Sequence, residues 1–332
     1  MRFYTLLFTI AAIVAISSCK PKSAYKPDNT ESETKALAIK AADFNADSAW
    51  YFVNEQVKFG PRVPNSKSHA NCALWLEKTL KKYAYQVVVQ PFTAKAYDGT
   101  TLNCKNIIAS FNPQSTNRVL LCSHWDSRPY ADNDPDTAFH RTPIDGANDG
   151  ASGVGILIEI ARQLKISPAS IGIDILLLDG EDYGAPKSAG FLGTDDWALG
   201  SQYWSRYPHV PAYSARYGIL LDMVGAENAV FTMEGTSMYY ASDVMQKVWN
   251  IAASIGYSDY FSTERTNGIT DDHLYINQLR QVPTIDIIQH DPSTNSGFYQ
   301  HWHTINDNMK GISKATLMAV GQTVLTTVRI EK

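Results

Sequence analysis

The sequence predicts an α/β fold arranged as a three-layer sandwich, with a mixed, mostly parallel central sheet and helices on both of its faces. Two observations lead to this prediction. Short apolar runs recur at 119–122, 173–178 and 219–221, and each is typical of a strand that is buried on both faces. Stretches with apolar residues at helical spacing alternate with these runs, as in a parallel sheet covered by helices.

The elements follow in order along the chain. Helices are expected at 48–58, 67–83, 151–164, 199–206, 241–255 and 313–328, because residues such as Trp50, Val53 and Val57 recur there at helical spacing. Strands are expected at 85–92, 106–111, up to 122, up to 178, 218–223, 229–233 and 284–288, where apolar and β-branched residues cluster. The sequence shows no internal repeat.

The N-terminal segment predicts export. Residues 1–18 place Arg2 before a Leu-, Ile- and Ala-rich stretch, which is typical of a secretory signal peptide and too short to span a membrane. The small residues before Cys19 resemble the lipobox of bacterial lipoproteins, and the alternative is a plain signal peptide with a coincidental cysteine. Residues 19–41 are polar, as in a flexible tether. Residues 42–332 contain no linker-like segment, so we expect a single catalytic domain there.

Composition narrows the classes of partner. The net charge is −4 and no stripe of Lys and Arg appears, so we expect no nucleic acid partner. The remaining cysteines, Cys72, Cys104 and Cys122, lack C-x-x-C spacing, which argues against a disulfide framework and against a thiolate zinc site. We expect Cys122, within an apolar run, to be a core residue. We expect the protein to be a monomer that acts on peptides.

Residues able to bind a metal ion occur mostly just beyond the expected strands. They are His124, Asp126, Asp149, Glu181, Asp182, Asp222 and His303. Ligands of an open α/β sheet bind at the carboxyl ends of its strands, so these side chains should converge at one rim. Carboxylates and imidazole are ligands of catalytic zinc. The sequence therefore predicts a site of the zinc hydrolase type.

Each of these residues also has a plain structural interpretation. Asp149 precedes an expected helix and would be an N-cap residue, and His303 would be an ordinary surface histidine. Glu181 and Asp182 would belong to a solvated acidic loop. Adjacent carboxylates repel each other, however, so their position at the mouth of a buried strand favours a bound cation or a shared proton.

Taken in order, these segments resemble the zinc-dependent aminopeptidases of bacteria, with Asp182 at the second position of their Glu-Glu pair. The motifs Asp271-Asp272-His273 and Trp302-His303-Thr304 more specifically resemble those of glutaminyl cyclases, the glutaminyl-peptide cyclotransferases of the animal type and their bacterial relatives. The resemblance covers almost all of the chain after the tether and implies a zinc aminopeptidase-like fold.

The resemblance implies roles for individual residues. One Zn²⁺ per chain would be held by Asp149, Asp182 and His303, and Glu181 would be the proton shuttle. Asp222 and Asp271 would hydrogen-bond with Glu181 in place of holding a second metal. Trp302, Trp197 and Phe298 would line the substrate pocket, although core packing is an equal alternative for each. The implied reaction converts the N-terminal glutamine of peptides or proteins to pyroglutamate and releases ammonia.

Two other interpretations stay open. A two-zinc aminopeptidase of the same superfamily would use His124 and Asp222 for its second metal, and both residues are present. Asp271 favours the cyclase, because an acid there has a role beside a shuttle glutamate and none in a two-metal peptidase. A binding protein that has lost activity should lack Glu181 or His303, and the chain retains both.

The expected location is the bacterial cell envelope. A lipid on Cys19 would anchor the protein in a membrane. Because no acidic run comes directly after Cys19, we expect the outer membrane, with the domain facing the periplasm.

Overall fold

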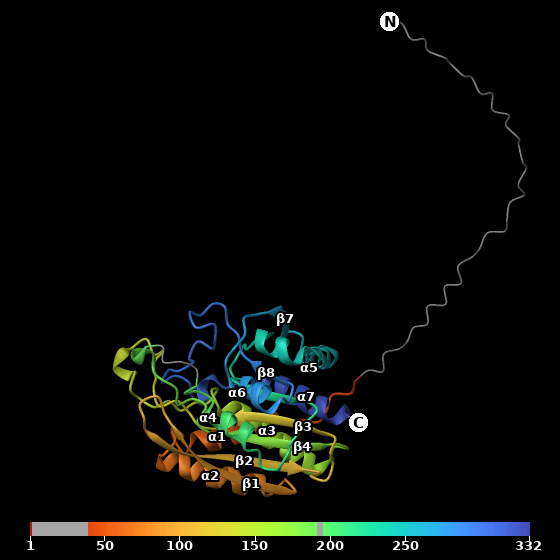
Figure 1. Cartoon of the computed structure of the whole chain (residues 1–332), viewed down its shortest axis with the longest axis horizontal. Helices are drawn as coiled ribbons and strands as arrows, with labels where there is room; N and C mark the ends of the chain where they lie inside the picture. The colour runs from red at the N-terminus through yellow and green to blue at the C-terminus, as the bar shows by residue number, and fades with distance from the viewer. Residues whose placement is uncertain (2–38, 191–194) are drawn as a thin grey trace, which may run out of the picture. The chain divides into compact units, whose positions relative to one another are not determined.

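A six-stranded sheet forms the centre of the computed structural model, which describes Met1 and residues 39–190 and 195–332 (Figure 1). In spatial order the strands are β1 (Gln86–Lys95), β2 (Thr101–Phe111), β4 (Gly172–Leu178), β3 (Arg118–His124), β5 (Gly218–Asp222) and β8 (Thr284–Ile288). The last four in this order run parallel, while β1 and β2 are antiparallel to their neighbours. This confirms the predicted mixed, mostly parallel sheet.

Helices cover both faces of the sheet. One face packs against α1 (Ala46–Val57), α2 (Lys67–Leu80), α3 (Ala151–Ile166), α5 (Gly235–Ser254) and α7 (Lys314–Ile330). The other face packs against α4 (Leu199–Arg206), α6 (Asp272–Tyr275) and the π-helical segment Ile276–Arg280. Short 3₁₀ helices occur at Thr137–Phe139, Lys187–Ala189 and Met309–Gly311, and β6 (Phe231–Met233) pairs with β7 (Phe261–Arg265) in a separate small sheet.

The alternating direction of the side chains along β3 shows why helices must cover both faces of the sheet. Val119 and Leu121 belong to the large core cluster on the α1–α3 face, whereas Leu120 and Cys122 belong to the cluster on the α4 face. All four side chains are fully buried. Successive side chains of a strand point to opposite faces, so a continuous apolar run requires cover on both. Cys122 is a core residue, as predicted.

The main departures from the predicted elements are local. The strand expected to start at 106 begins at Thr101, because the 96–100 turn joins β1 and β2 in a hairpin, with the Ala96 N–H donating to the Thr100 carbonyl at 2.9 Å. The helix expected to start at 241 begins at Gly235 and is kinked at Ala241. The segments β7 and α6 were not predicted.

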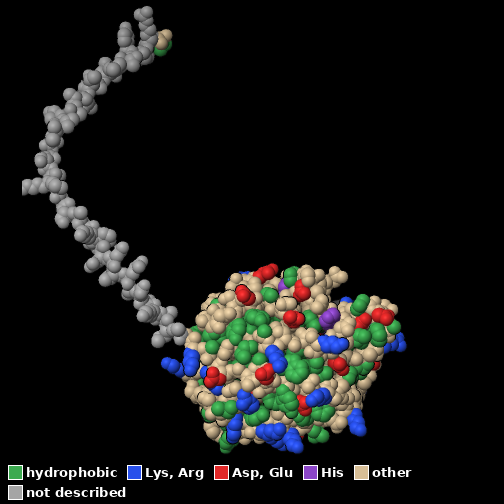
Figure 2. Space-filling model, turned by 180° about the vertical axis from the view of Figure 1, so that it is seen from behind, with side chains coloured by type: hydrophobic (Ala, Val, Ile, Leu, Met, Phe, Trp, Pro, Cys, Tyr) green, Lys and Arg blue, Asp and Glu red, His purple; other side chains and the backbone are tan. Residues whose placement is uncertain are grey.

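The described residues Ile39–Lys332 form one compact unit. The expected signal peptide, Cys19 and nearly all of the expected tether lie outside the described residues, so the domain boundaries remain predictions. Within the described part, none of the helices combines the length and apolar character needed to cross a bilayer. The face seen in Figure 2 intersperses Lys and Arg with acidic and hydrophobic side chains.

Candidate active site

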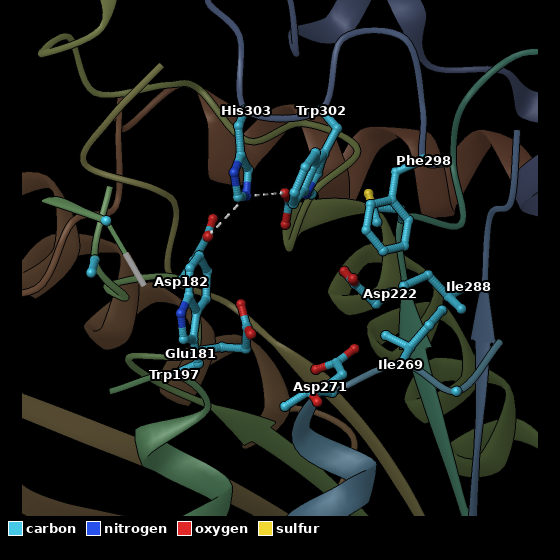
Figure 3. Close-up of a pocket in the computed structure, with 16 residues that line it drawn as sticks. Glu181, Asp182, Trp197, Asp222, Ile269, Asp271, Ile288, Phe298, Trp302 and His303 are labelled. Atoms are coloured by element: carbon cyan, nitrogen blue, oxygen red, sulfur yellow. Dashed lines mark ion pairs between the residues drawn. The ribbon is translucent and has the colours of Figure 1, made fainter. Parts of the chain in front are cut away.

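The polar rim predicted from the strand ends is present. The connections after β3, β4, β5 and β8 line a cavity of about 450 Å³. Its lining includes Asp149, Glu181, Asp182, Asp222, Asp271 and His303. Figure 3 shows five of these side chains around one central space, with apolar residues along one side; the five are Glu181, Asp182, Asp222, Asp271 and His303. The carboxyl ends of parallel strands meet at the same edge of a sheet, which explains why residues far apart in the chain converge.

One potential metal-binding group consists of Asp149, Asp182 and His303. An atom from each lies within 4.8 Å of the others, and all three residues are buried. The His303 Nε2 atom lies 3.2 Å from Asp182 Oδ1 and 3.5 Å from Asp149 Oδ2. Both Asp182 carboxylate oxygens are buried without a hydrogen-bond donor. Buried acceptors without donors are costly unless a cation satisfies them, so this group suits a metal ion.

A second group of three shares one carboxylate with the first. The His124 Nε2 atom lies 3.1 Å from Asp149 Oδ1 and 3.1 Å from Asp222 Oδ1. Although burial opposes it, hydrogen bonding to Asp126, Asp149 and Asp222 raises the pKa of His124 well above its ordinary value. The fold thus joins the two groups through the two oxygens of Asp149.

Electrostatics favour positive charge in the first group. Burial and the charge of Asp149 raise the pKa of the Asp182 carboxyl. The pKa of His303 is raised as well, because Asp182 and Asp132 outweigh the effects of burial and of Arg128. Without a metal, Asp182 and His303 therefore hold protons more tightly than free side chains do, whereas His124 lowers the pKa of Asp149 although burial opposes this. A divalent cation supplies the same compensation, and carboxylate–imidazole ligation with an open position is typical of catalytic zinc.

Glu181 lies between Asp182 and Asp271 at the edge of the cavity (Figure 3). Its backbone comes directly after Gly180, which adopts a φ of +73°. Asp126 accepts hydrogen bonds from the backbone N–H groups of Glu181 at 3.1 Å and Asp182 at 3.2 Å, and so fixes the turn. Burial, with the charges of Asp271 and Asp182, raises the pKa of Glu181 well above its ordinary value. Glu181 is therefore a carboxyl that binds a proton more tightly than a free glutamate does.

Of the two expected acid partners of Glu181, Asp271 acts on its pKa through charge, whereas Asp222 contacts His124. Asp222 hydrogen-bonds to His124 at 3.1 Å, and Asp271 accepts the backbone N–H of Asp272 as the N-cap of α6. Among the described residues, no hydrogen bond joins either acid to Glu181. Burial, with the charges of Asp149 and Asp271, raises the pKa of Asp222 to about 7. The acids thus form an electrostatically coupled cluster.

The three aromatic residues predicted for the pocket all line it. Trp302 stacks on His303 with ring centroids 3.9 Å apart, and Phe298 lies 4.8 Å from Trp302. On the other side, Trp197 stacks on His303 at 6.1 Å, in nearly parallel planes. Ile269, Ile288 and Met223 add apolar wall that the sequence did not reveal. The cavity therefore has apolar walls and polar groups at one end, as small-ligand pockets commonly do.

Sequence reasoning missed the residues that hold the ligands in place. Asp132 lies 3.5 Å from His303 Nδ1 and forms a two-pronged ion pair with Arg128, both contacts at 2.8 Å. Asp307 accepts the backbone N–H of Asp149 at 3.0 Å. These residues lie in irregular loops, where no periodic pattern marks them. They orient the potential metal ligands, as outer residues of metal sites commonly do.

Glycine is required directly after Asp149. Gly150 adopts a φ of +93°, and a Cβ there would lie 2.7 Å from the Asp126 carbonyl oxygen and 2.9 Å from His124 Cε1. His303 itself adopts a left-handed φ of +54°. Unfavourable backbone conformations of this kind persist where surrounding contacts enforce them, often at functional sites.

Comparison with known proteins agrees with this geometry. Residues 106–328 match the model of peptidase family M28. A glutaminyl-peptide cyclotransferase from Gloydius blomhoffii is 26% identical over 240 residues, which are 64% of this chain and 61% of that protein. The chain thus matches less than two thirds of the length of that relative.

Two crystal structures are similar over 88% of this chain and the whole of theirs, each with a TM-score of 0.86. One is the glutaminyl cyclase of Bacteroides thetaiotaomicron bound to N-acetylhistamine, at 53% identity. The other is a Zn-dependent exopeptidase from Parabacteroides distasonis, at 50% identity.

Proposed function

This chain belongs to peptidase family M28, and within that family we propose that it is a glutaminyl-peptide cyclotransferase. Its substrates are peptides or proteins with an N-terminal glutamine, which it converts to pyroglutamate with release of ammonia. The 53% identity to a glutaminyl cyclase over 88% of the chain supports this activity. The likeness to aminopeptidases reflects the superfamily that they share with glutaminyl cyclases.

Asp271 is the observation that carries the choice between cyclase and peptidase. It comes from the start of α6 and lines the same cavity as Glu181, to which it contributes a negative charge. A two-metal hydrolase would gain nothing from an acid at this position. A cyclase needs a carboxyl that both accepts and returns a proton, and a neighbouring acid raises the affinity of Glu181 for that proton.

The residues divide the chemistry between them. Glu181 takes a proton from the attacking α-amine and delivers it to the departing side-chain nitrogen. The bond between the α-nitrogen and the side-chain carbonyl carbon forms, the bond from that carbon to the amide nitrogen breaks, and no water is consumed. Trp302, Phe298 and Ile269 enclose the methylene groups of the glutamine and exclude water from the ring closure.

Asp149, Asp182 and His303 would hold a single Zn²⁺, with one position left for substrate. Both carboxylate oxygens of Asp182 are buried and receive no hydrogen bond, which supports this assignment. When bound, the metal supplies Lewis-acid polarisation of the glutamine side-chain carbonyl. Asp132 and Arg128 keep His303 and Asp182 oriented for it.

A two-zinc aminopeptidase is the second candidate. The group His124, Asp149 and Asp222 is close enough to hold another cation, and one close structural relative is named a Zn-dependent exopeptidase. In the cyclase, the His124 imidazole would instead pair with both carboxylates, since its Nε2 atom lies 3.1 Å from Asp149 Oδ1 and 3.1 Å from Asp222 Oδ1.

Incubation with a glutaminyl dipeptide, followed by mass spectrometry, tests the proposed function. Cyclisation lowers the peptide mass by that of ammonia and leaves the peptide bond intact. Peptidase action adds water and yields free glutamine. Release of free glutamine without pyroglutamyl peptide would refute the proposal in favour of the second candidate.

We also propose that the protein is a monomer and is anchored in the bacterial outer membrane, facing the periplasm, by a lipid on Cys19. The basis is the lipobox-like sequence before Cys19, with the polar segment after it. Both lie outside the described residues.

A further inference from the structure

The cavity of about 450 Å³ around Glu181 and His303, which we term the glutamine pocket, adjoins a second hollow, and that hollow adjoins a third. A cavity of about 310 Å³ shares Ala185, Gly190, Trp197, Trp302 and His303 with the glutamine pocket. A larger cavity of about 780 Å³, which we term the outer basin, shares Asp132, Pro186 and Lys187 with the middle one. The outer basin is lined chiefly by Tyr97, Tyr130, Thr137, His140, Arg141 and Lys187. The shared lining residues place the three hollows next to one another, with the middle one between the other two.

The middle cavity adjoins the glutamine pocket at Trp197 and His303. Trp197 and His303 belong to both inner cavities, and Trp197 lies across the site from Phe298 and Ile288 (Figure 3). The two other hollows that we describe, around Tyr83 and around Glu227, share no residue with the glutamine pocket. Among the hollows described here, the middle cavity and the outer basin therefore offer the space nearest to the glutamine pocket for the rest of a substrate chain.

The charge of the outer basin is positive. Lys187 and Arg141 are exposed cations on its lining, whereas its only acid, Asp132, is held in a two-pronged ion pair with Arg128. The nearby acids Asp98 and Asp136 are exposed and lie outside the lining. Two exposed cations beside an apolar floor favour a chain that brings a carboxylate.

Aromatic side chains give the outer basin a rigid floor. The Tyr97 and Tyr130 hydroxyl groups are hydrogen-bonded to each other at 3.0 Å, and their rings meet edge to face. The guanidinium of Arg128 lies 5.7 Å from the centre of the Tyr130 ring. Rigid tyrosines give contact area at low entropic cost, which suits recognition of a peptide.

We propose that the outer basin binds the substrate chain downstream of the cyclising glutamine, and that Lys187 and Arg141 select substrates with acidic residues there. This inference rests on the proposed cyclase activity. The third and later residues of the substrate are the ones that reach the outer basin, because the second must cross the middle cavity. Substrate preference is then set by residues outside the catalytic pocket.

Peptide pairs test the selection directly. The specificity constant kcat/KM is measured for Gln-Ala-Glu-Glu and Gln-Ala-Lys-Lys amides, with glutamine amide as the short reference. We expect the acidic peptide to be preferred by roughly threefold to tenfold at low salt, with less preference at high salt, as for partly exposed charges. In the double variant Lys187→Glu/Arg141→Glu, the ratio of kcat/KM for the acidic peptide to kcat/KM for the basic peptide should invert. Partial misfolding of a variant lowers both constants equally, so it does not change this ratio.

Lys165→Glu is the matched control. Lys165 is an exposed lysine in an unconnected hollow, so its reversal should leave the ratio as in the unmodified protein. Equal constants for the two peptides, or a ratio unchanged in the double variant while glutamine amide is still cyclised, would overturn the selection and leave the proposed function standing. Failure to cyclise any of the three substrates would overturn the proposed function and this inference with it.

Discussion

The His303 Nε2 atom lies 3.2 Å from the Oδ1 atom of Asp182, and neither oxygen of that buried carboxylate receives a hydrogen bond. The chain therefore buries an acid whose only close cationic neighbours among the described residues are the imidazole and the Arg128 Nη1 atom, which lies 3.6 Å from the same oxygen. This pairing is the strongest sign that the site is built for a cation.

Removal of either partner should remove zinc. We predict that the purified protein contains one Zn²⁺ per chain, and that His303→Ala reduces the zinc content well below one. His301→Ala, two positions away and outside the proposed metal group, should retain it. Elemental analysis after dialysis checks both variants. Two tightly bound zinc ions per chain would instead support the peptidase.

Asp271→Asn should shift the acid limb of the pH profile. Burial and the charge of Asp271 raise the pKa of Glu181, and Glu181 must be ionised to accept the proton of the α-amine. Loss of that charge lowers the pKa of Glu181, so the fall of kcat/KM in acid should move to lower pH. We also expect kcat to fall about tenfold or more, because a Glu181 of lower pKa is a weaker base toward the attacking amine.

The measurement is kcat/KM for glutamine amide from pH 5 to pH 9, with the exposed residue Asp259 changed to Asn as the control. An acid limb that stays in place, or that moves to higher pH, would contradict the coupling.

Metal-free protein should lose stability as pH rises. The pKa values of Asp222, Glu181 and Asp182 are raised by burial and neighbouring acids, and Asp222 reaches about 7. A carboxyl whose folded pKa exceeds its unfolded value near 4 favours folding most at low pH, and this contribution is lost as pH rises through the folded pKa. The raised pKa values of His124 and His303 act in the same direction above about pH 6.5.

Thermal unfolding of chelator-treated protein checks this expectation. Its Tm should fall between about pH 5 and pH 8, and added zinc should restore more stability at pH 8 than at pH 5, because the metal replaces the lost protons. A Tm that rises over this range without metal would mean that these acids are paired in another way.

Lipidation of Cys19 is predicted from the sequence alone. In a bacterial host, the full chain should incorporate labelled palmitate and sediment with membranes, while Cys19→Ala should do neither. Ser23→Ala, within the same expected tether, is the control and should behave as the unmodified chain. Labelling that persists in Cys19→Ala would contradict the anchor.

The sheet and its rim were predictable because the signals are local. The centres of β3 and β4 are mainly apolar, and parallel strands deliver the residues after them to one edge of the sheet. β7 was missed because Ser262 to Arg265 are polar and largely exposed, and β7 pairs only with the short β6. The start of α6 was missed because it is a single turn, stabilised by the Asp271 cap.

The residues that support the ligands could not be read from the sequence. The contact of Asp132 with His303 joins residues 171 positions apart in the chain, and no spacing rule reports such a meeting. Asp307 is similarly remote from the Asp149 backbone that it holds. Their roles depend on loop packing, which appears only when the strands are assembled.

The most direct test of the account uses Glu181→Gln. The amide keeps the size of the side chain but cannot accept a proton, so zinc content should stay unchanged while kcat falls by about 10²–10⁴-fold. Zinc analysis and cyclisation of a glutaminyl dipeptide are measured on the same preparation. Normal turnover in a variant that retains its zinc would contradict the role of Glu181 as the proton carrier.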